Sequence, residues 1–160
     1  MTLERVFVGL GANLGDAQGT VLKAIQDLSQ LPGTVGVARS ALYRSSPVQA
    51  QGPDFINAVA ELRTDLSPLQ LLRQLQALEA AHGRQRPFHH APRTLDLDLL
   101  LMGGQQVAST DLTLPHPRLH QRAFVLLPLL ELAPDIVHPS LGALQPYLSA
   151  VANQAIERLP

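Results

Sequence analysis

Apolar and polar residues follow two different periods along this chain, and the switches between them mark the expected elements. Short apolar or alternating runs bounded by glycine, proline or polar turn residues predict strands. Apolar residues recurring every three or four positions predict helices. The expected elements are strands at 6–8, 35–43, 55–62 and 95–102, and helices from 16–20 to 28 and over 68–82. Up to residue 102 the order is therefore β-α-β-β-α-β.

The remaining segments give weaker signals. Short strand segments are expected at 107–108 and 112–114, followed by a helix over 119–132 that Pro128 interrupts or kinks. A final, weaker helix is expected over 143–158, where Pro146 could break it.

The glycine-rich stretch at 9–16 is expected to form a turn after the first strand. A dinucleotide-binding fingerprint would need a third glycine at position 14, which is Leu14. We therefore exclude that function for this stretch.

The best-defined helix begins at Ser67, which can cap it, and Gln70 stands where it would complete a capping box. Gly83 ends the helix. Near its end, Gln76 and Glu79 are three residues apart and share one face. They form either a solvated polar pair or contacts to a ligand.

Composition indicates one soluble domain, and we treat residues 1–160 as a single unit. A length of 160 residues with 46% hydrophobic residues suits one full-sized core. The net charge of −1 argues against a general nucleic-acid or membrane-surface binder. No cysteine, no signal-peptide pattern and no apolar stretch of membrane-spanning length occur. We expect a cytoplasmic protein that binds neither nucleic acid nor membrane.

Two carboxylates begin the strand at 95–102. Because side chains alternate along a strand, Asp96 and Asp98 share one face and the neighbouring leucines share the other. Adjacent carboxylates at the rim of a core repel each other and lose solvation, so they need a cation. Oxygen ligands favour Mg²⁺, which completes its shell with water and substrate phosphates. The alternative is a strand with a simply acidic exposed face.

A basic segment at 84–93 precedes this pair and contains three arginines, two histidines and two prolines. It could clamp phosphates, or it could be a solvated basic loop that pairs with the acids. In the first case we expect it to become ordered over the phosphates when substrates bind. Asn57, at the start of another strand, could read the edge of a heterocycle or close a loop through the backbone.

Six blocks of sequence, covering nearly the whole chain, also resemble one known family. The central block is His89-x-Ala91-Pro92-Arg93-x-x-Asp96-Leu97-Asp98-Leu99-Leu100. The other blocks are 11–15, 43–47, 53–58, 79–84 and 114–124. In order and nearly in spacing, they are similar to the blocks of the 6-hydroxymethyl-7,8-dihydropterin pyrophosphokinases of folate biosynthesis.

The resemblance implies a ferredoxin-like α+β sandwich, with helices packed on an antiparallel sheet, and agrees with the β-α-β-β-α-β order. It implies an ATP-dependent diphosphotransferase (pyrophosphokinase) that moves diphosphate from ATP to the hydroxymethyl group of the pterin and releases AMP. Because such a transfer depends on positioning and charge neutralisation more than on a strong base, no general base is assigned.

The resemblance also implies roles for particular residues. Two Mg²⁺ ions would be held by Asp96 and Asp98, which with Arg84 and Arg93 form the catalytic set. The implied ATP-binding residues are Gln76, Glu79, Arg84, Arg93, Thr113, His116 and Arg122. The implied pterin-binding residues are Ser45, Ser46, Pro47, Val48, Phe55, Asn57, Asp96 and Phe124, in which the two phenylalanines enclose the ring.

The chain departs from the family pattern at four positions. Ser46 replaces a loop proline, Phe55 stands where tyrosine is frequent, His90 stands near the place of a bulky aromatic residue, and Asp111 replaces an arginine found in some members. None of them belongs to the expected metal pair.

Two other functions are compatible with the residues. The chain could be a non-catalytic ferredoxin-like module that binds a nucleotide or single-stranded nucleic acid, or an Mg-dependent phosphotransferase with another acceptor. Only four Phe and two Tyr, with a nearly neutral charge, argue against the nucleic-acid module. A monomer acting on ATP and the pterin is the expected form.

Overall fold

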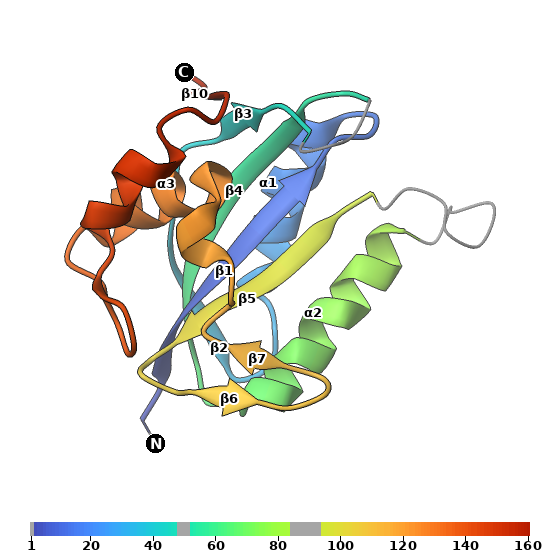
Figure 1. The fold of residues 1–160 in the computed structure, drawn as a ribbon. Coiled ribbons are helices and arrows are strands. Elements are labelled where there is room, and N and C mark those ends of the chain that lie inside the picture. Colours follow the sequence, from blue (N-terminus) through green and yellow to red (C-terminus); the bar gives the residue numbers. More distant parts are fainter. Residues whose placement is uncertain (1, 48–51, 84–93) are drawn as a thin grey trace.

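The computed structural model describes residues 2–47, 52–83 and 94–160 (Figure 1). A six-stranded antiparallel sheet lies between two layers of helices. The strands and helices before residue 103 are β1 (Glu4–Ala12), α1 (Ala17–Leu28), β2 (Thr34–Arg39), β3 (Tyr43–Ser45), β4 (Phe55–Thr64), α2 (Pro68–His82) and β5 (Asp96–Met102). Those that follow are β6 (Val107–Ala108), β7 (Thr113–Leu114), the 3-10 helix η1 (Leu119–Gln121), α3 (Ala123–Leu132), β8 (Val137–His138), β9 (Gly142–Ala143), the 3-10 helix η2 (Gln145–Val151) and β10 (Ile156–Arg158).

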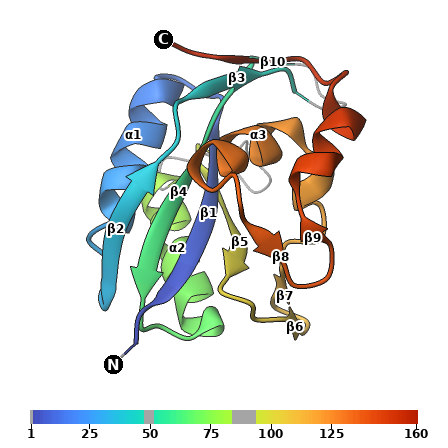
Figure 2. The same ribbon diagram turned by 90° about the vertical axis from the view of Figure 1, so that its left-hand side faces the viewer.

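The sheet has the strand order β10-β3-β4-β1-β5, and β2 also pairs with β4. Helices α1 and α2 cover one face, and α3 with the C-terminal segments covers part of the other (Figure 2). Each face carries its own apolar cluster. The central strand β1 is buried from its third residue to its end. This arrangement confirms the predicted ferredoxin-like α+β sandwich.

The predicted alternation along β5 is confirmed. Leu95, Leu97 and Leu99 join the cluster beneath α1 and α2, so Asp96 and Asp98 face the opposite side. Helix α2 begins with the expected capping box: Ser67 Oγ accepts from the Gln70 amide at 3.2 Å, and Gln70 Oε1 accepts from the Ser67 amide at 2.9 Å.

The prediction of a turn at 9–16 is wrong for its first residues, because β1 continues to Ala12. Both edges of this stretch are paired: Gly9 lies opposite Val59 on β4 and Asp98 on β5. Strands β4 and β5 provide hydrogen-bonding partners for the backbone on both sides of this stretch, and these partners favour a strand. The local glycine content cannot reveal such distant partners.

The predicted strand over 35–43 is broken in the structure into β2 and β3. Arg39 pairs with Ala60 and Tyr43 with Asn57, so three residues on one side span two on β4. The Ser40 hydroxyl fills the gap by accepting a hydrogen bond from the Val59 amide at 3.0 Å. One extra residue of this kind interrupts a ladder locally, as in a β-bulge.

The helix predicted over 119–132 is interrupted, but not at Pro128. The break lies at Arg122, whose backbone is extended (φ −122°, ψ 116°) between η1 and α3. Helix α3 continues through Pro128 without a break. Tertiary contacts around Arg122 therefore decide where this segment changes direction.

The helix predicted over 143–158 is wrong. The segment forms β9, the short helix η2 and the edge strand β10, whose Ile156 pairs with Ser45 on β3. Backbone hydrogen bonds to the sheet edge replace those of a helix here. Among the described residues, no helix is long and apolar enough to cross a lipid bilayer.

Candidate active site

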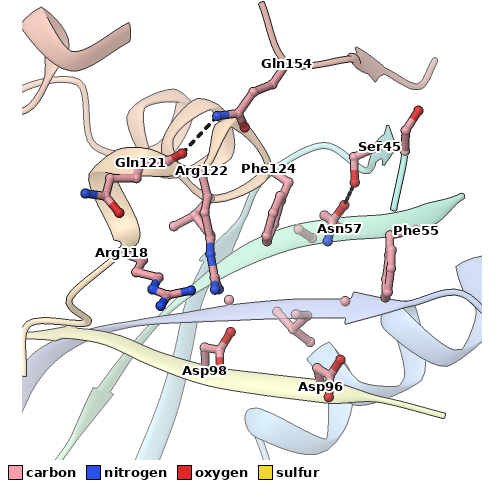
Figure 3. Close-up of a pocket in the computed structure, with 16 residues that line it drawn as sticks. Ser45, Phe55, Asn57, Asp96, Asp98, Arg118, Gln121, Arg122, Phe124 and Gln154 are labelled. Atoms are coloured by element: carbon pink, nitrogen blue, oxygen red, sulfur yellow. Dashed lines mark hydrogen bonds between the residues drawn. The ribbon is translucent and has the colours of Figure 1, made fainter. Parts of the chain in front are cut away.

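A pocket of about 800 Å³ opens on the face of the sheet that α3 only partly covers. This volume suits a small-molecule ligand. The strands β1, β4 and β5 contribute its floor, and the η1–α3 segment and the C-terminal chain contribute its wall (Figure 3). The lining residues are Gly9, Leu10, Gly11, Ser45, Ser46, Phe55, Asn57, Ala58, Asp96, Asp98, Arg118, Gln121, Arg122, Phe124, Val125 and Gln154.

Two glycines leave space above the carboxylate pair. In the ladder between β1 and β5, Gly11 lies opposite Asp96 and Gly9 lies opposite Asp98. Any larger residue at these two positions would place a side chain on the pocket floor beside the carboxylates. Both aspartates are half-buried, which leaves their oxygens accessible from the pocket. The floor can therefore accept a cation and the group that this cation binds.

The donor set at this position fits Mg²⁺. It consists of two carboxylates, and no group of three or more His, Cys, Asp or Glu that could hold a metal occurs among residues 2–47, 52–83 and 94–160. Mg²⁺ is commonly bound by one or two carboxylates and keeps its other positions for water and phosphates. A zinc site would require more protein ligands than this part of the chain provides.

Cationic side chains lie across the pocket from the carboxylates. Arg118 and Arg122 come from either side of η1, and Figure 3 shows both guanidinium groups directed toward Asp98. The guanidinium of Arg122 also lies over the Phe124 ring, with its Cζ 5.6 Å from the ring centroid. An anion bound above the aspartates would meet these arginines.

His116 lies close to this charged group. Burial lowers the pKa of His116 below its usual value, and the charges of Arg122 and Arg118 lower it further, whereas Asp98 acts in the opposite direction. Its Nδ1 accepts a hydrogen bond from the Arg118 amide at 3.1 Å. The ring is therefore neutral near pH 7 and carries its proton on Nε2, where it can donate.

Two aromatic rings and a side-chain amide line another part of the pocket. The Phe55 and Phe124 rings stand on opposite sides of a gap, and Asn57 lies between them at the back of the pocket (Figure 3). Asn57 is only 4% exposed, and its Oδ1 accepts a hydrogen bond from Ser45 Oγ at 2.5 Å. Because its oxygen is engaged, Asn57 presents its NH₂ group as a donor. A flat heterocycle would fit between these groups.

Of the predicted site residues, the pocket brings together Ser45, Ser46, Phe55, Asn57, Asp96, Asp98, Arg122 and Phe124. Five others lie outside its lining: Pro47, Gln76, Glu79, Thr113 and His116. Thr113 and His116 instead line a second pocket of about 420 Å³.

Gln76 and Glu79 on α2 have separate hydrogen-bonding partners, so they do not form the solvated pair that was one of the two alternatives. Glu79 Oε2 accepts from the Leu97 amide at 2.8 Å and thereby attaches α2 to β5 between the two aspartates. Gln76 accepts from Arg73 Nη1 at 2.9 Å, and Arg73 Nη2 lies 3.4 Å from Asp111. Arg73 on α2 therefore places a positive charge beside Asp111, one of the positions at which this chain departs from the family pattern.

Val48, Arg84, Arg93 and the rest of the basic segment at 84–93 lie outside the described residues. The expected roles of these residues therefore remain predictions from the sequence.

Sequence reasoning missed several lining residues, notably Gly9, Gly11, Arg118, Gln121 and Gln154. The glycine content of 9–16 predicts a turn, although the two-residue spacing of Gly9 and Gly11 also suits one face of a strand. Gln154 gave no local signal, because its position depends on how the C-terminal segment folds back to the sheet.

Comparison with known proteins identifies the same family over most of the chain. Residues 7–134 match the sequence model of the family described as 7,8-dihydro-6-hydroxymethylpterin-pyrophosphokinase (HPPK). A Pseudomonas aeruginosa protein named 2-amino-4-hydroxy-6-hydroxymethyldihydropteridine pyrophosphokinase is 45% identical over 159 residues, which are 99% of this chain and 98% of that protein. A Haemophilus influenzae protein of the same name is 43% identical over 135 residues, 84% of each chain.

Solved structures support the fold. The structure titled "Crystal Structure Analysis of the HPPK-DHPS in complex with substrates" matches with a TM-score of 0.75 at 12% identity, over 94% of this chain and 43% of that one. A Plasmodium falciparum HPPK-DHPS structure matches with a TM-score of 0.74 at 13% identity, over 94% of this chain and 46% of that one. This chain thus spans less than half of those two, and they show the fold alone.

A non-catalytic binding module is not favoured by these findings, because the named relatives are enzymes and align with 99% and 84% of the chain. A phosphotransferase with another acceptor is not favoured either, because the matching family is defined by its pterin substrate. The chain belongs to the 7,8-dihydro-6-hydroxymethylpterin-pyrophosphokinase family and is a pyrophosphokinase of folate biosynthesis.

Proposed function

We propose that the pocket above β1, β4 and β5 is the site of this pyrophosphoryl transfer, with the pterin and the ATP phosphates at its two ends. The observation that carries the proposal is the placement of a carboxylate pair and an aromatic pair in one pocket. The first suits a magnesium-bound diphosphate, and the second suits a flat apolar ring with polar edges.

The pterin would lie between Phe55 and Phe124. A flat ring between two aromatic side chains buries apolar surface on both faces and stacks against both rings, and both effects favour binding. The Asn57 NH₂ group would donate to an acceptor on the ring edge, while Ser45 holds the Asn57 oxygen. Ser46, Pro47 and Val48 would complete the contacts to the ring edge, Val48 on sequence grounds alone.

The ATP phosphates would lie between the aspartates and the arginines. We propose that Asp96 and Asp98 hold two Mg²⁺ ions, and that Arg122, with His116 Nε2, contacts phosphate oxygens. Arg84 and Arg93 would add further cationic contacts, on sequence grounds alone. The remaining proposed ATP contacts are Gln76 and Glu79 on α2 and Thr113 on β7, two elements that flank β5 (Figure 1).

In the proposed reaction the pterin hydroxymethyl oxygen attacks the β-phosphorus of ATP. A bond forms between that oxygen and the β-phosphorus, the bond from the β-phosphorus to the oxygen that bridges it to the α-phosphorus breaks, AMP leaves with that oxygen, and the hydroxyl proton is released to solvent. Bound Mg²⁺ would supply neutralisation of charge on the phosphate oxygens. The chain itself orients the two substrates: the aromatic pair and Asn57 fix the ring, and Arg122 fixes the phosphates.

We propose in addition that the chain works as a monomer in the cytoplasm. The lack of cysteine in its sequence suits a reducing compartment.

The proposed site predicts strict dependence on three components. We expect AMP to form only when ATP, Mg²⁺ and 6-hydroxymethyl-7,8-dihydropterin are all present, as measured by chromatographic separation of nucleotides. Equilibrium titration with Mn²⁺ as a spectroscopic substitute, in the presence of the pterin and a non-hydrolysable ATP analogue, should reach two ions per chain. Failure to form AMP would contradict the activity, whereas saturation at one ion would contradict only the two-ion site.

The pocket floor gives a second prediction at Gly11. A Cβ there would lie 3.0 Å from Asn57 Nδ2, a tighter contact than ordinary packing, and would push the amide away from the ring edge. We expect Gly11→Ala to weaken pterin affinity about tenfold, equivalent to about 1.4 kcal/mol, and to weaken ATP affinity less, because the added methyl group contacts the Asn57 amide first. Titration of each ligand would measure this.

Gly104→Ala is the matched control, because a Cβ at Gly104 would meet no atom within 4 Å. Like Gly11→Ala, this variant lowers the conformational entropy of the unfolded chain, but residue 104 does not line the pocket. Equal pterin affinity for the two variants would show that the Asn57 amide is not constrained by Gly11.

A further inference from the structure

Gln154 lies in the turn between η2 and β10, and its side chain reaches across to the pocket wall (Figure 3). Its Oε1 accepts a hydrogen bond from the Ala123 amide at 2.8 Å, and its Nε2 donates to the Gln121 carbonyl at 2.9 Å. One side chain 31 to 33 residues away in sequence therefore holds the backbone on both sides of Arg122.

These two contacts restrain the backbone conformation of Arg122. The Gln121 carbonyl belongs to the peptide group before Arg122, and the Ala123 amide belongs to the peptide group after it. Fixing both peptide groups fixes φ and ψ between them, which are −122° and 116° in the structure. Arg122 is thereby held extended between two helical segments.

The start of α3 depends on the same contact. The residue at its N-cap is Arg122, which makes no capping hydrogen bond with its side chain. The first amide groups of a helix lack partners within the helix, and a side-chain oxygen usually satisfies one of them. Here Gln154 Oε1 takes this place from a distant part of the chain, at the Ala123 amide.

Arg122 and Phe124 take their directions from this junction. The Arg122 guanidinium lies over the Phe124 ring and points toward Asp98, and the ring faces Phe55 across the pocket (Figure 3). The residue after Gln154 also reaches the opposite side: the Ala155 carbonyl accepts a hydrogen bond from the Ser46 amide at 3.4 Å. The turn at 154–155 thus connects both sides of the pocket.

We propose that Gln154 is a positioning residue for pyrophosphoryl transfer, which sets the η1–α3 junction so that Arg122 and Phe124 face the substrates. This inference rests on the roles proposed above for those two residues. Gln154 acts through the backbone of its two partners.

The test replaces Gln154 with leucine, which removes both hydrogen bonds and nearly keeps the volume of the side chain. We expect Gln154→Leu to weaken pterin affinity about tenfold, measured with a saturating non-hydrolysable ATP analogue, and to lower kcat by a similar factor. Gln145→Leu is the matched control, because Gln145 is an exposed glutamine with a single hydrogen bond to the Pro134 carbonyl, outside the pocket. It should leave both quantities within about twofold.

A double-mutant cycle with Phe124→Ala separates positioning from general destabilisation. If Gln154 acts by placing Phe124, its loss should cost little pterin affinity once the ring is absent, so the two effects should be strongly non-additive. Full additivity, or unchanged affinity in Gln154→Leu, would overturn the positioning role. Unchanged affinity in Phe124→Ala alone would overturn the proposed pterin site, and the positioning role with it.

A second variant covers the case in which Gln154→Leu does not fold. Gln154→Asn keeps the amide but shortens the side chain by one methylene, so it cannot reach both backbone groups at their present distances. The same loss of pterin affinity and the same non-additivity with Phe124→Ala are expected. Normal affinity in Gln154→Asn would contradict the proposal.

Discussion

Asp96→Asn and Asp98→Asn should each lower turnover by at least about a hundredfold, because each removes a charge that the phosphate-bound cation requires. The Asn side chain keeps the volume and one oxygen of the carboxylate, so packing on the pocket floor should be preserved. Steady-state AMP formation at saturating ATP, pterin and Mg²⁺ would measure the loss. Excess Mg²⁺ should recover only part of it, because mass action can refill a weakened site but cannot replace the lost charge beside the bound ion.

Stability should not follow activity in these variants. Both aspartates are half-buried on the pocket floor, where solvent screens their charges, so we expect melting temperatures within a few degrees of the unchanged protein. Removing one of two neighbouring negative charges can even raise the melting temperature in the absence of metal. Thermal melts with and without Mg²⁺ would test this separation.

Asp135→Asn is the matched control, because Asp135 is exposed and lies outside the pocket lining. It should change neither turnover nor the response to Mg²⁺. Near-normal turnover in Asp96→Asn or Asp98→Asn would exclude that residue from the metal site, and the proposed pair would then be reduced to a single ligand.

Asn57→Ala should weaken pterin affinity by about ten- to a hundredfold, which corresponds to about 1–3 kcal/mol for a buried polar edge left without its partner. ATP affinity should stay nearly unchanged, because Asn57 lies between the two aromatic rings proposed to hold the pterin (Figure 3) and is separated from Asp96 by Gly11 in the ladder. Separate titrations of the pterin and of an ATP analogue would show the difference.

Ser45→Ala provides the comparison for Asn57→Ala. It removes the hydroxyl that bonds to Asn57 Oδ1 but leaves the NH₂ group that would face the ring. We expect a smaller loss of pterin affinity than in Asn57→Ala, and similar losses of stability in both variants, because each breaks the same buried hydrogen bond. Equal losses of pterin and ATP affinity in Asn57→Ala would point to a structural role at the start of β4.

Several features of the site could be predicted from local sequence because short-range rules decide them. Side chains alternate along any strand, so Asp96 and Asp98 had to share a face once an apolar strand was assigned to 95–102. The capping box of α2 also depends only on residues three apart, Ser67 and Gln70. The resemblance to a family added roles for Phe55, Asn57 and Phe124, which the structure brings into one pocket.

Other features depended on partners far away in the chain. The stretch at Gly9 and Gly11 became a strand because β4 and β5 pair with it on both sides. The last residues became the edge strand β10 because β3 offers free backbone groups, although their apolar spacing resembled a helix. A local pattern contains no information on such neighbours. Hydrogen bonding to neighbouring strands therefore decided the conformation of both stretches, against the local preference for a turn or a helix.

The sequence alone therefore determined the order of the main elements, the face that carries the carboxylates and the family of enzyme. Tertiary structure alone decided that glycines on β1 lie opposite Asp96 and Asp98, and that the chain turns at Arg122 instead of Pro128. It also brought Gln154 to the Gln121 carbonyl and the Ala123 amide, more than 30 residues away. The physical reason is the range of the interactions, since periodicity and capping act over a few residues, whereas ladder pairing and hydrogen bonds between distant segments form only in the folded chain.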